Sequence, residues 1–343
     1  MGFFDVPFHP HPAILALHFF VAPLLAVFIR PDPRWSYVDA LVCRYLLVFT
    51  QLPTPLVRAA FAAAAFAQRL VYRPYQIVDT PTVKGLWYGD KSIPLSASVV
   101  VLFLHGGGFV SGSADCMALT AIAPIIEALE RQGVAAKVFS VDYGLSPEHV
   151  FPRAIDQMME AYRWLLDQGI SPDKIVLAGD SAGGNAVVSI LQRSLIEKLP
   201  MPVCAVLSSP WLNLSPEAAS YSTTLDIGNK QTLVEWGEMY LGGKMELLAA
   251  ASPALHRVDG LPPLLIVYGL NEGLLDDMTL FITKAKRANV HVSEHVHPYM
   301  YHNFAFMPLE AAAEAHAAMA KFISQHVVSK TLPAPTTGIA LSF

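Results

Sequence analysis

The chain has 343 residues, of which 53% are hydrophobic and only 15% are charged. A chain of this length and composition can bury a large core, most simply as one domain with an appendage. The net charge of −5 and the lack of any Lys/Arg cluster argue against nucleic-acid binding, which requires a basic footprint.

The three cysteines, Cys43, Cys116 and Cys204, are far apart and odd in number. They predict neither a disulfide framework nor zinc-ligand spacing. We therefore expect an intracellular, reducing location, in the cytoplasm or peripherally at a membrane such as that of the endoplasmic reticulum.

The first 75 residues are apolar and divided by prolines. Residues 13–29 carry no formal charge and would form a helix of about 26 Å, at the lower limit for crossing a bilayer. No basic segment precedes them and no small-residue cleavage site follows, which disfavours a signal peptide. Residues 37–49 and 56–71 give two further apolar helical patterns. Residues 1–75 therefore predict either a helical cap forming a lid over a hydrophobic pocket or a membrane anchor acting through residues 13–29.

From Gln76 onward, strand and helix patterns alternate. Residues 99–104 form a continuous apolar run typical of a strand buried on both faces. A helical segment at 118–132, a strand at 136–141, a helix ending near Gln168 and strands at 175–177, 203–208, 264–268 and 291–297 follow. This alternation predicts a mainly parallel sheet covered by helices on both faces, an α/β fold.

Two glycine-rich turns follow predicted strands. The first is His105-Gly-Gly-Gly-Phe109, a loop whose uncovered backbone N–H groups can point at one oxygen atom, as an oxyanion hole requires. The second is Gly179-Asp-Ser181-Ala-Gly183, which lies between a strand and a helix. This strand, turn and helix predict a nucleophile elbow that lifts Ser181 above the sheet at a helix N-terminus, where a developing negative charge is favoured. The glycines remove Cβ atoms that would clash with the neighbouring strand and helix.

These two turns, with the segment 142–148 and the Phe151-Pro152 pair, resemble those of the hormone-sensitive-lipase-like esterases of the α/β-hydrolase superfamily. Ser208-Ser-Pro-Trp211 and Tyr240-Leu-Gly-Gly243 resemble the same family. The resemblance implies an α/β-hydrolase catalytic domain over residues 76–330, followed by a C-terminal tail over 331–343. Residues 1–75 match only in being helical and apolar, as the family's N-terminal cap is.

A serine nucleophile needs a base and an acid, which follow it in the order acid, then histidine, in this superfamily. The family commonly has Asp-Pro-Leu-x-Asp after the strand at 264–268, and this alignment places the acid at Glu272, with Asp276 as the second choice. A glutamate departs from the usual aspartate but is chemically competent. Asp277 is expected to begin the next helix or to face solvent. The family's histidine lies in a loop after such a strand, which implies His302.

The resemblance also implies oxyanion donors at Gly107, Gly108 and Ala182. We expect Asp180 to support the elbow rather than to react. Phe109 is assigned to substrate binding, and Trp211 is expected to line the pocket or, equally, to pack in the core. His295 and His297 share one strand face, but two imidazoles without a third ligand indicate surface residues rather than a metal site.

The combined prediction is a serine carboxylic-ester hydrolase that forms a covalent acyl-enzyme and uses no cofactor. An apolar lid favours a hydrophobic ester with a short or medium acyl group, such as an acetylated sterol-like or terpenoid-like alcohol. Two alternatives stay open at this point: an acyltransferase or cyclase with the same triad, and a non-catalytic receptor for a small hydrophobic molecule. The presence of His302 argues against the receptor.

Overall fold

The computed structural model describes residues 30, 32–223, 226 and 230–331. The segment 13–29, considered above as a membrane anchor, lies outside the described residues, as does the tail from residue 332. Within the described ranges, no helix is both long and apolar enough to cross a membrane.

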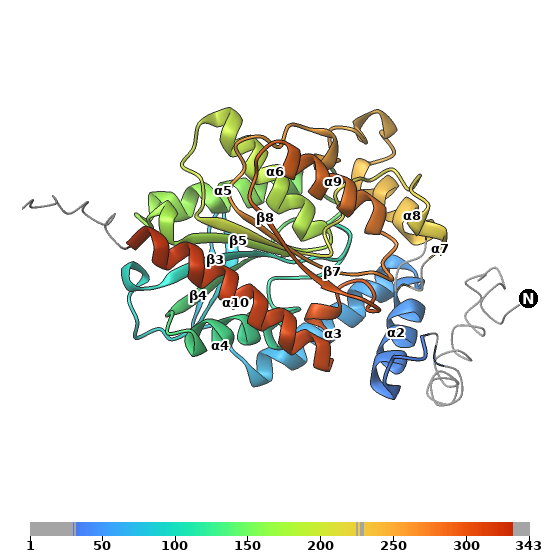
Figure 1. The fold of residues 1–343 in the computed structure, drawn as a ribbon, viewed down its shortest axis with the longest axis horizontal. Coiled ribbons are helices and arrows are strands. Elements are labelled where there is room, and N and C mark those ends of the chain that lie inside the picture. Colours follow the sequence, from blue (N-terminus) through green and yellow to red (C-terminus); the bar gives the residue numbers. More distant parts are fainter. Residues whose placement is uncertain (1–29, 31, 224–225, 227–229, 332–343) are drawn as a thin grey trace, which may run out of the picture.

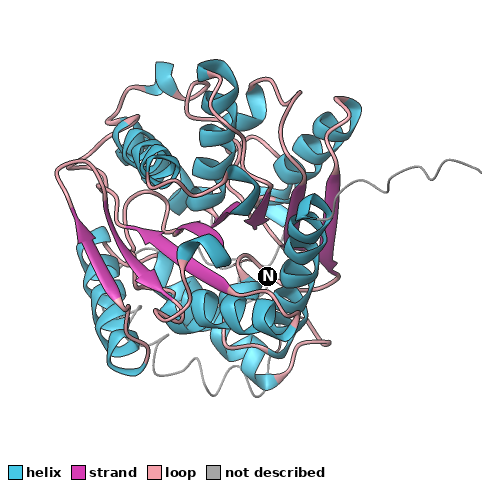
Figure 2. Cartoon of the chain, turned by 90° about the vertical axis from the view of Figure 1, so that its left-hand side faces the viewer, coloured by secondary structure: helices cyan, strands magenta, loops and turns pink. Residues whose placement is uncertain are grey.

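One eight-stranded sheet forms the centre of the molecule (Figures 1 and 2). Its order is β1-β2-β4-β3-β5-β6-β7-β8, and the six strands from β4 to β8 run parallel, which confirms the predicted sheet. The first two strands form an antiparallel edge that the sequence analysis did not resolve. The strands are β1 Gln76–Asp79, β2 Lys84–Tyr88, β3 Val99–Leu104, β4 Ala136–Val141, β5 Ile175–Asp180, β6 Cys204–Ser208, β7 Leu264–Gly269 and β8 Val292–His297.

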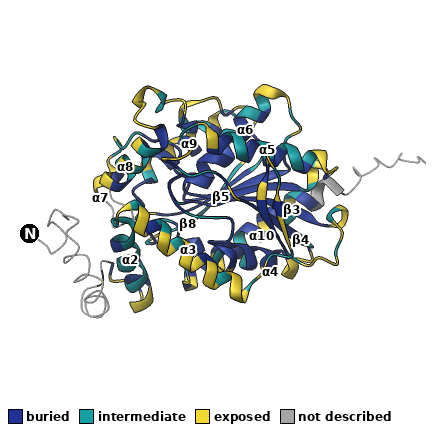
Figure 3. Cartoon of the chain, turned by 180° about the vertical axis from the view of Figure 1, so that it is seen from behind, coloured by how far each residue is buried: buried dark blue, intermediate teal, exposed yellow. Residues whose placement is uncertain are grey.

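Helices cover both faces of the sheet, and the strands between them are buried (Figure 3). Alternate residues of β3 point to opposite layers: Leu102 packs with α5, α6 and α9, whereas Val101 and Phe103 pack with α4 and α10. Two cores on either side of one sheet result. The helices are α2 Tyr37–Thr50, α3 Thr54–Val71, α4 Ala123–Arg131, α5 Arg153–Asp167, α6 Ala182–Glu197, α7 Ser220–Thr223, α8 Lys230–Leu241, α9 Leu275–Arg287 and α10 Glu310–Thr331.

The predicted helices at 37–49 and 56–71 are present as α2 and α3. Two reciprocal hydrogen bonds, a capping box, stabilise the N-terminus of α2. Ser36 Oγ accepts from the Asp39 N–H at 3.1 Å, and the Asp39 carboxylate accepts from the Ser36 N–H at 2.8 Å. Arg58 of α3 donates to the Val110 carbonyl at 2.7 Å and pairs with Glu148 at 2.7 Å. These bonds attach α3 to the segments that follow β3 and β4. The strand β1 begins at the predicted boundary, although the division of the chain into domains remains a prediction.

Candidate active site

Five neighbouring strands bring the functional side chains to one edge of the sheet. β3, β5, β6, β7 and β8 are adjacent in the sheet, and the glycine loop, Ser181, Ser209, Glu272 and His302 follow their respective carboxyl ends. Because parallel strands end at the same edge, residues far apart in the chain meet there.

Ser181 occupies the sharp turn that the sequence predicted. Its φ of 51° and ψ of −116° are uncommon for a residue with a side chain, and it immediately precedes α6. A Cβ added to Gly183 would lie 1.9 Å from the Leu104 carbonyl oxygen, and one added to Gly179 would lie 2.6 Å from the backbone of Gly183. Both glycines therefore allow the helix to approach the sheet closely enough to form the elbow.

The glycine loop after β3 turns its backbone through left-handed conformations, with φ of 103° at Gly107 and 63° at Gly108. The Gly106 carbonyl oxygen lies within hydrogen-bond distance of His105 Nδ1, at 2.8 Å, and the Gly107 carbonyl accepts from the Ser111 N–H at 3.0 Å. In a trans peptide the N–H points opposite to the carbonyl. The N–H groups of Gly107 and Gly108 therefore point away from those partners, and both residues line the main pocket.

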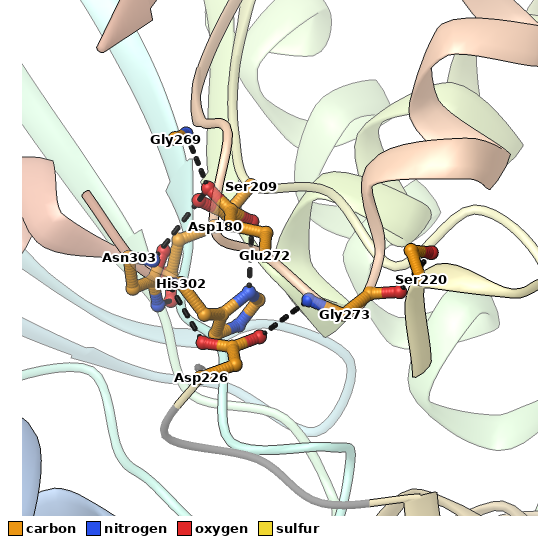
Figure 4. Close-up of polar contacts among 9 residues, drawn as sticks. All are labelled: Asp180, Ser209, Ser220, Asp226, Gly269, Glu272, Gly273, His302 and Asn303. Atoms are coloured by element: carbon orange, nitrogen blue, oxygen red, sulfur yellow. Dashed lines mark hydrogen bonds and ion pairs between the residues drawn. The ribbon is translucent and has the colours of Figure 1, made fainter. Parts of the chain in front are cut away.

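The structure places Glu272, not Asp276, against His302 (Figure 4). Glu272 is fully buried, and its Oε2 lies 3.2 Å from His302 Nδ1. Its Oε1 accepts from Ser209 Oγ and from the Gly269 N–H, each at 2.7 Å. The contact at Nδ1 leaves the opposite ring nitrogen, Nε2, for the pocket, which His302 and the nucleophile elbow both line.

The other two acidic candidates lie in the first turn of α9, which begins after Glu272. Asp276 accepts from the Ser220 N–H at 3.0 Å. Asp277 begins the helix as expected, but it is buried rather than facing solvent, and it accepts from Asn213 at 3.0 Å. Glu272 precedes α9 and contacts the imidazole, whereas both aspartates lie within the first turn of the helix and bind other partners.

Asp180 joins the glycine loop to the histidine loop. It accepts from the Gly106 N–H at 2.8 Å and from Asn303 Nδ2 at 2.5 Å, and it is fully buried. The Asn303 N–H in turn donates to Ser209 Oγ at 2.9 Å. Asp180 therefore links the nucleophile elbow, to which it belongs, with the glycine loop and the histidine loop. The sequence had led us to expect support of the elbow alone.

Asp226 is a residue of the site that sequence reasoning missed. Its Oδ1 accepts from the backbone N–H of His302, and its Oδ2 from that of Gly273, each at 2.8 Å (Figure 4). It precedes α8 in a stretch without strand or helix patterning and without a motif. No sequence signal distinguished it from a loop aspartate.

Three carboxylates act on the titration of His302. Burial by itself lowers the pKa of His302, but the hydrogen bond and charge of Glu272, with the charges of Asp226 and Asp180, raise it above its ordinary value. Burial raises the pKa of Asp180 to about 6. It also raises the pKa of Asp226 to about 6, against the opposing effect of the His302 charge. An imidazolium at position 302 is thus electrostatically favoured.

A cavity of about 540 Å³ opens over Ser181. Its walls come from the glycine loop, the histidine loop and the helices α2, α3 and α8, and its lining is mostly aliphatic and aromatic. Among these residues are Phe49, Phe61, Leu233 and Trp236. Helices from the N-terminal part of the chain, α2 and α3, and α8 from its second half therefore surround one apolar pocket.

The two aromatic residues assigned to the pocket differ in placement. Trp211 lies in the cavity lining and is also almost fully buried, and a contact with substrate stays a prediction. Phe109 is fully buried and stacks on Tyr240 at 3.9 Å between ring centroids, outside the cavity lining. The ring therefore has a packing role in the core behind the loop, and its assignment to substrate binding stays a prediction.

His295 and His297 are half-buried near Glu314 of α10 rather than on the open surface, and burial lowers the pKa of each. In the described part of the chain, no group of three or more His, Cys, Asp or Glu residues is arranged to hold a metal ion.

Comparison with known proteins places this geometry in a family. Residues 101–306 match the family described as alpha/beta hydrolase fold. An acetyl-hydrolase of Streptomyces hygroscopicus is 36% identical over 208 residues, covering 59% of this chain and 67% of the relative. An esterase of Acinetobacter venetianus is 34% identical over 217 residues, covering 61% and 68%.

Solved structures extend the similarity over most of the fold. A hormone-sensitive lipase from a metagenome library superposes with a TM-score of 0.74 at 28% identity, covering 86% of this chain and all of that one. The esterase EstE5, soaked with p-nitrophenyl butyrate, gives a TM-score of 0.73 at 27% identity over 91% of this chain and 99% of that one. The chain therefore belongs to the α/β-hydrolase fold family, among its hormone-sensitive-lipase-like carboxylic ester hydrolases.

Proposed function

We propose that this chain hydrolyses hydrophobic carboxylic esters by two-step acyl transfer, with Ser181 as nucleophile, His302 as base and Glu272 as the acid that orients it. The observation that carries the proposal is the contact between Glu272 and His302 Nδ1 at 3.2 Å, beside a pocket that both His302 and Ser181 line. A serine hydroxyl is a weak nucleophile and needs this assistance.

In the first step, His302 Nε2 takes the proton from Ser181 as the Oγ attacks the ester carbonyl carbon. Glu272 holds the neutral ring with Nδ1 protonated and stabilises the imidazolium that forms. The tetrahedral intermediate collapses when the alcohol oxygen leaves with the proton from His302. The acyl group then remains on Ser181 as an ester.

The negative oxygen of the intermediate is assigned to the N–H groups of Gly107, Gly108 and Ala182. The first two are free to point at the pocket because the preceding carbonyls are bonded on the opposite side. Ala182 is the first residue of α6, where the helix dipole favours negative charge. Loss of one such donor typically costs about 10² to 10³ in rate.

In the second step, water attacks the acyl carbon while His302 accepts its proton. The bond between Ser181 Oγ and the acyl carbon then breaks, His302 returns the proton to Ser181 Oγ, and the carboxylic acid is released. The same acyl-enzyme would acylate an alcohol in a transferase or close a ring in a cyclase, and only the exclusion of water separates these outcomes. Hydrolysis is the reaction in the names of the esterase and acetyl-hydrolase relatives.

The substrate proposed is a hydrophobic ester with a short or medium acyl group, such as the acetate of a sterol-like or terpenoid-like alcohol. The cavity has the size of an ordinary small-molecule site, and its mostly apolar lining favours an uncharged, hydrophobic alcohol. The name of the Streptomyces acetyl-hydrolase agrees with a small acyl group. α2 and α3 contribute to these walls, which supports their role as a cap.

The test compares wild-type protein with Ser181→Ala on p-nitrophenyl acetate and octanoate. Turnover with an initial burst that the variant lacks is expected. Turnover that Ser181→Ala leaves unchanged, or no turnover by the wild type, would overturn this assignment. The second result would favour the alternative of a non-catalytic receptor for a small hydrophobic molecule. Product analysis with a competing apolar alcohol then separates hydrolysis from acyl transfer.

A further inference from the structure

Asp226 bridges the two loops that carry the proposed acid and base. One carboxylate oxygen accepts from the N–H of His302 itself, and the other accepts from the N–H of Gly273, the residue directly after Glu272, each at 2.8 Å. The two loops follow neighbouring strands, β7 and β8. A single side chain therefore fixes the separation of the backbones from which the interacting Glu272 and His302 side chains project.

The origin of Asp226 connects this bridge to the pocket wall. It lies between α7 and α8, and α8 supplies Leu233 and Trp236 to the cavity. Asp226 itself is not among the residues that line the cavity. A change at this position should therefore act on the reacting groups rather than on substrate contacts.

The choice of a carboxylate here has an electrostatic cost. Two backbone N–H groups are satisfied equally well by neutral acceptors. A carboxylate that is half-buried, as Asp226 is, costs free energy unless a positive charge pairs with it. The titratable groups around Asp226 are His302 and Glu272, with Tyr221, Tyr301 and Cys43 on the elements packed beside it. The His302 imidazole is the member of this set that gains a positive charge during the reaction, and Arg44 of α2, which interacts with the same Cys43, is a permanent cation nearby.

We propose that Asp226 is a positioning residue of the ester hydrolase: it holds His302 in register with Glu272 and stabilises the imidazolium formed when Ser181 loses its proton. This inference rests on the proposed function. It adds a second carboxylate, from the segment before α8, to the pair formed by His302 and Glu272.

Asp276 provides the matched control. It is an acidic residue in the first turn of α9, and its carboxylate also accepts from one backbone N–H, that of Ser220 at the start of α7, at 3.0 Å. It does not contact His302. The experiment measures kcat, KM and the pH profile of Asp226→Asn, Asp226→Glu and Asp276→Asn on p-nitrophenyl acetate, with thermal unfolding as the test of folding.

Asp226→Asn removes the charge and turns an amide NH₂ toward one of the two N–H donors. We expect kcat to fall about 10- to 100-fold, as small misplacements of reacting groups do, with little change in KM. The acid limb of the kcat/KM profile should move to lower pH, because the imidazolium loses a stabilising charge. Asp226→Glu should recover part of the rate and restore the position of the limb, and Asp276→Asn should match the wild type.

A folded Asp226→Asn with wild-type kcat and an unmoved acid limb would overturn the proposal, as would an equal effect of Asp276→Asn. If the Asp226 variants do not fold, the hydrogen bond from His302 to Asp226 is tested in wild-type protein labelled with ¹⁵N-histidine, by the exchange rate of the His302 amide proton with solvent. Slow exchange is expected, and rapid exchange would reject the bond to Asp226. If Ser181→Ala abolishes turnover in the same assay, failure at Asp226 leaves the proposed function intact.

Discussion

Replacing Glu272 by Gln keeps the size of the side chain but removes its charge and one acceptor oxygen. In the structure all three contacts of this carboxylate involve donors: His302 Nδ1, Ser209 Oγ and the Gly269 N–H. The amide NH₂ of Gln must face at least one of them. If it faces the imidazole, Nδ1 has to accept, the proton moves to Nε2, and the ring can no longer take the proton from Ser181.

The size of the effect follows from the distance between Glu272 and His302. Two unit charges at 3.2 Å attract each other by about 5 kcal/mol at an effective dielectric constant of about 20. At about 1.36 kcal/mol for each factor of ten in rate, loss of most of this stabilisation of the imidazolium corresponds to about 10³ to 10⁴ in kcat/KM.

The assay is steady-state hydrolysis of p-nitrophenyl acetate by Glu272→Gln, with folding checked by thermal unfolding. Asp276→Asn is the comparison, because the Asp276 carboxylate accepts from the backbone N–H of Ser220 rather than from His302, and this variant should leave the rate near normal. Retention of more than about a tenth of the wild-type rate by folded Glu272→Gln would refute the reasoning. So would a large loss in Asp276→Asn.

Three further predictions concern the elbow, the pocket and pH. Gly183→Ala puts a Cβ 1.9 Å from a carbonyl oxygen of β3 and should lower the free energy of unfolding by about 1–3 kcal/mol or more in denaturant titration. Gly237→Ala, whose Cβ meets nothing nearer than 3.8 Å inside α8, should instead stabilise by about 0.5–1 kcal/mol, and equal losses in both would contradict this account. Trp236 lies over Gly108, where an added Cβ would come within 2.2 Å of the ring. Trp236→Ala should therefore raise the ratio of kcat/KM for octanoate to that for acetate by about tenfold. An unchanged ratio would show that this ring does not limit the length of the acyl group. Because the pKa of His302 is raised above the ordinary 6.5, kcat/KM should be lost as pH falls through that raised value and regained above it, and a flat profile from about pH 5 to 9 would exclude His302 as the base.

The sequence predicted the strands and turns of the site well because those signals are local. An apolar run buried on both faces, such as that of β3, is readable from neighbouring residues, and so is a turn that only glycines at positions 179 and 183 permit. The same holds for α2, where an acidic residue three positions after Ser36 closes the first turn.

Local patterns gave less guidance on the direction in which a side chain points. Phe109 belongs to a recognisable loop, yet its backbone conformation turns the ring into the core against Tyr240. Asp226 lies in a stretch with no motif, and only its tertiary contacts with His302 and Gly273 show that it belongs to the site.

The sequence by itself determined the parallel sheet and the nucleophile turn, because each depends on residue types at short, fixed spacings. The chemistry of an ester hydrolase was implied by the resemblance of these motifs to the hormone-sensitive-lipase-like esterases. Only the tertiary structure decided that Glu272 rather than Asp276 contacts His302, that Asp180 and Asp226 join separate loops, and that α2, α3 and α8 close one apolar pocket. These contacts span from 30 to more than 100 residues of chain. They arise where parallel strands end side by side, which is a property of the strand order in the sheet rather than of neighbours in the sequence.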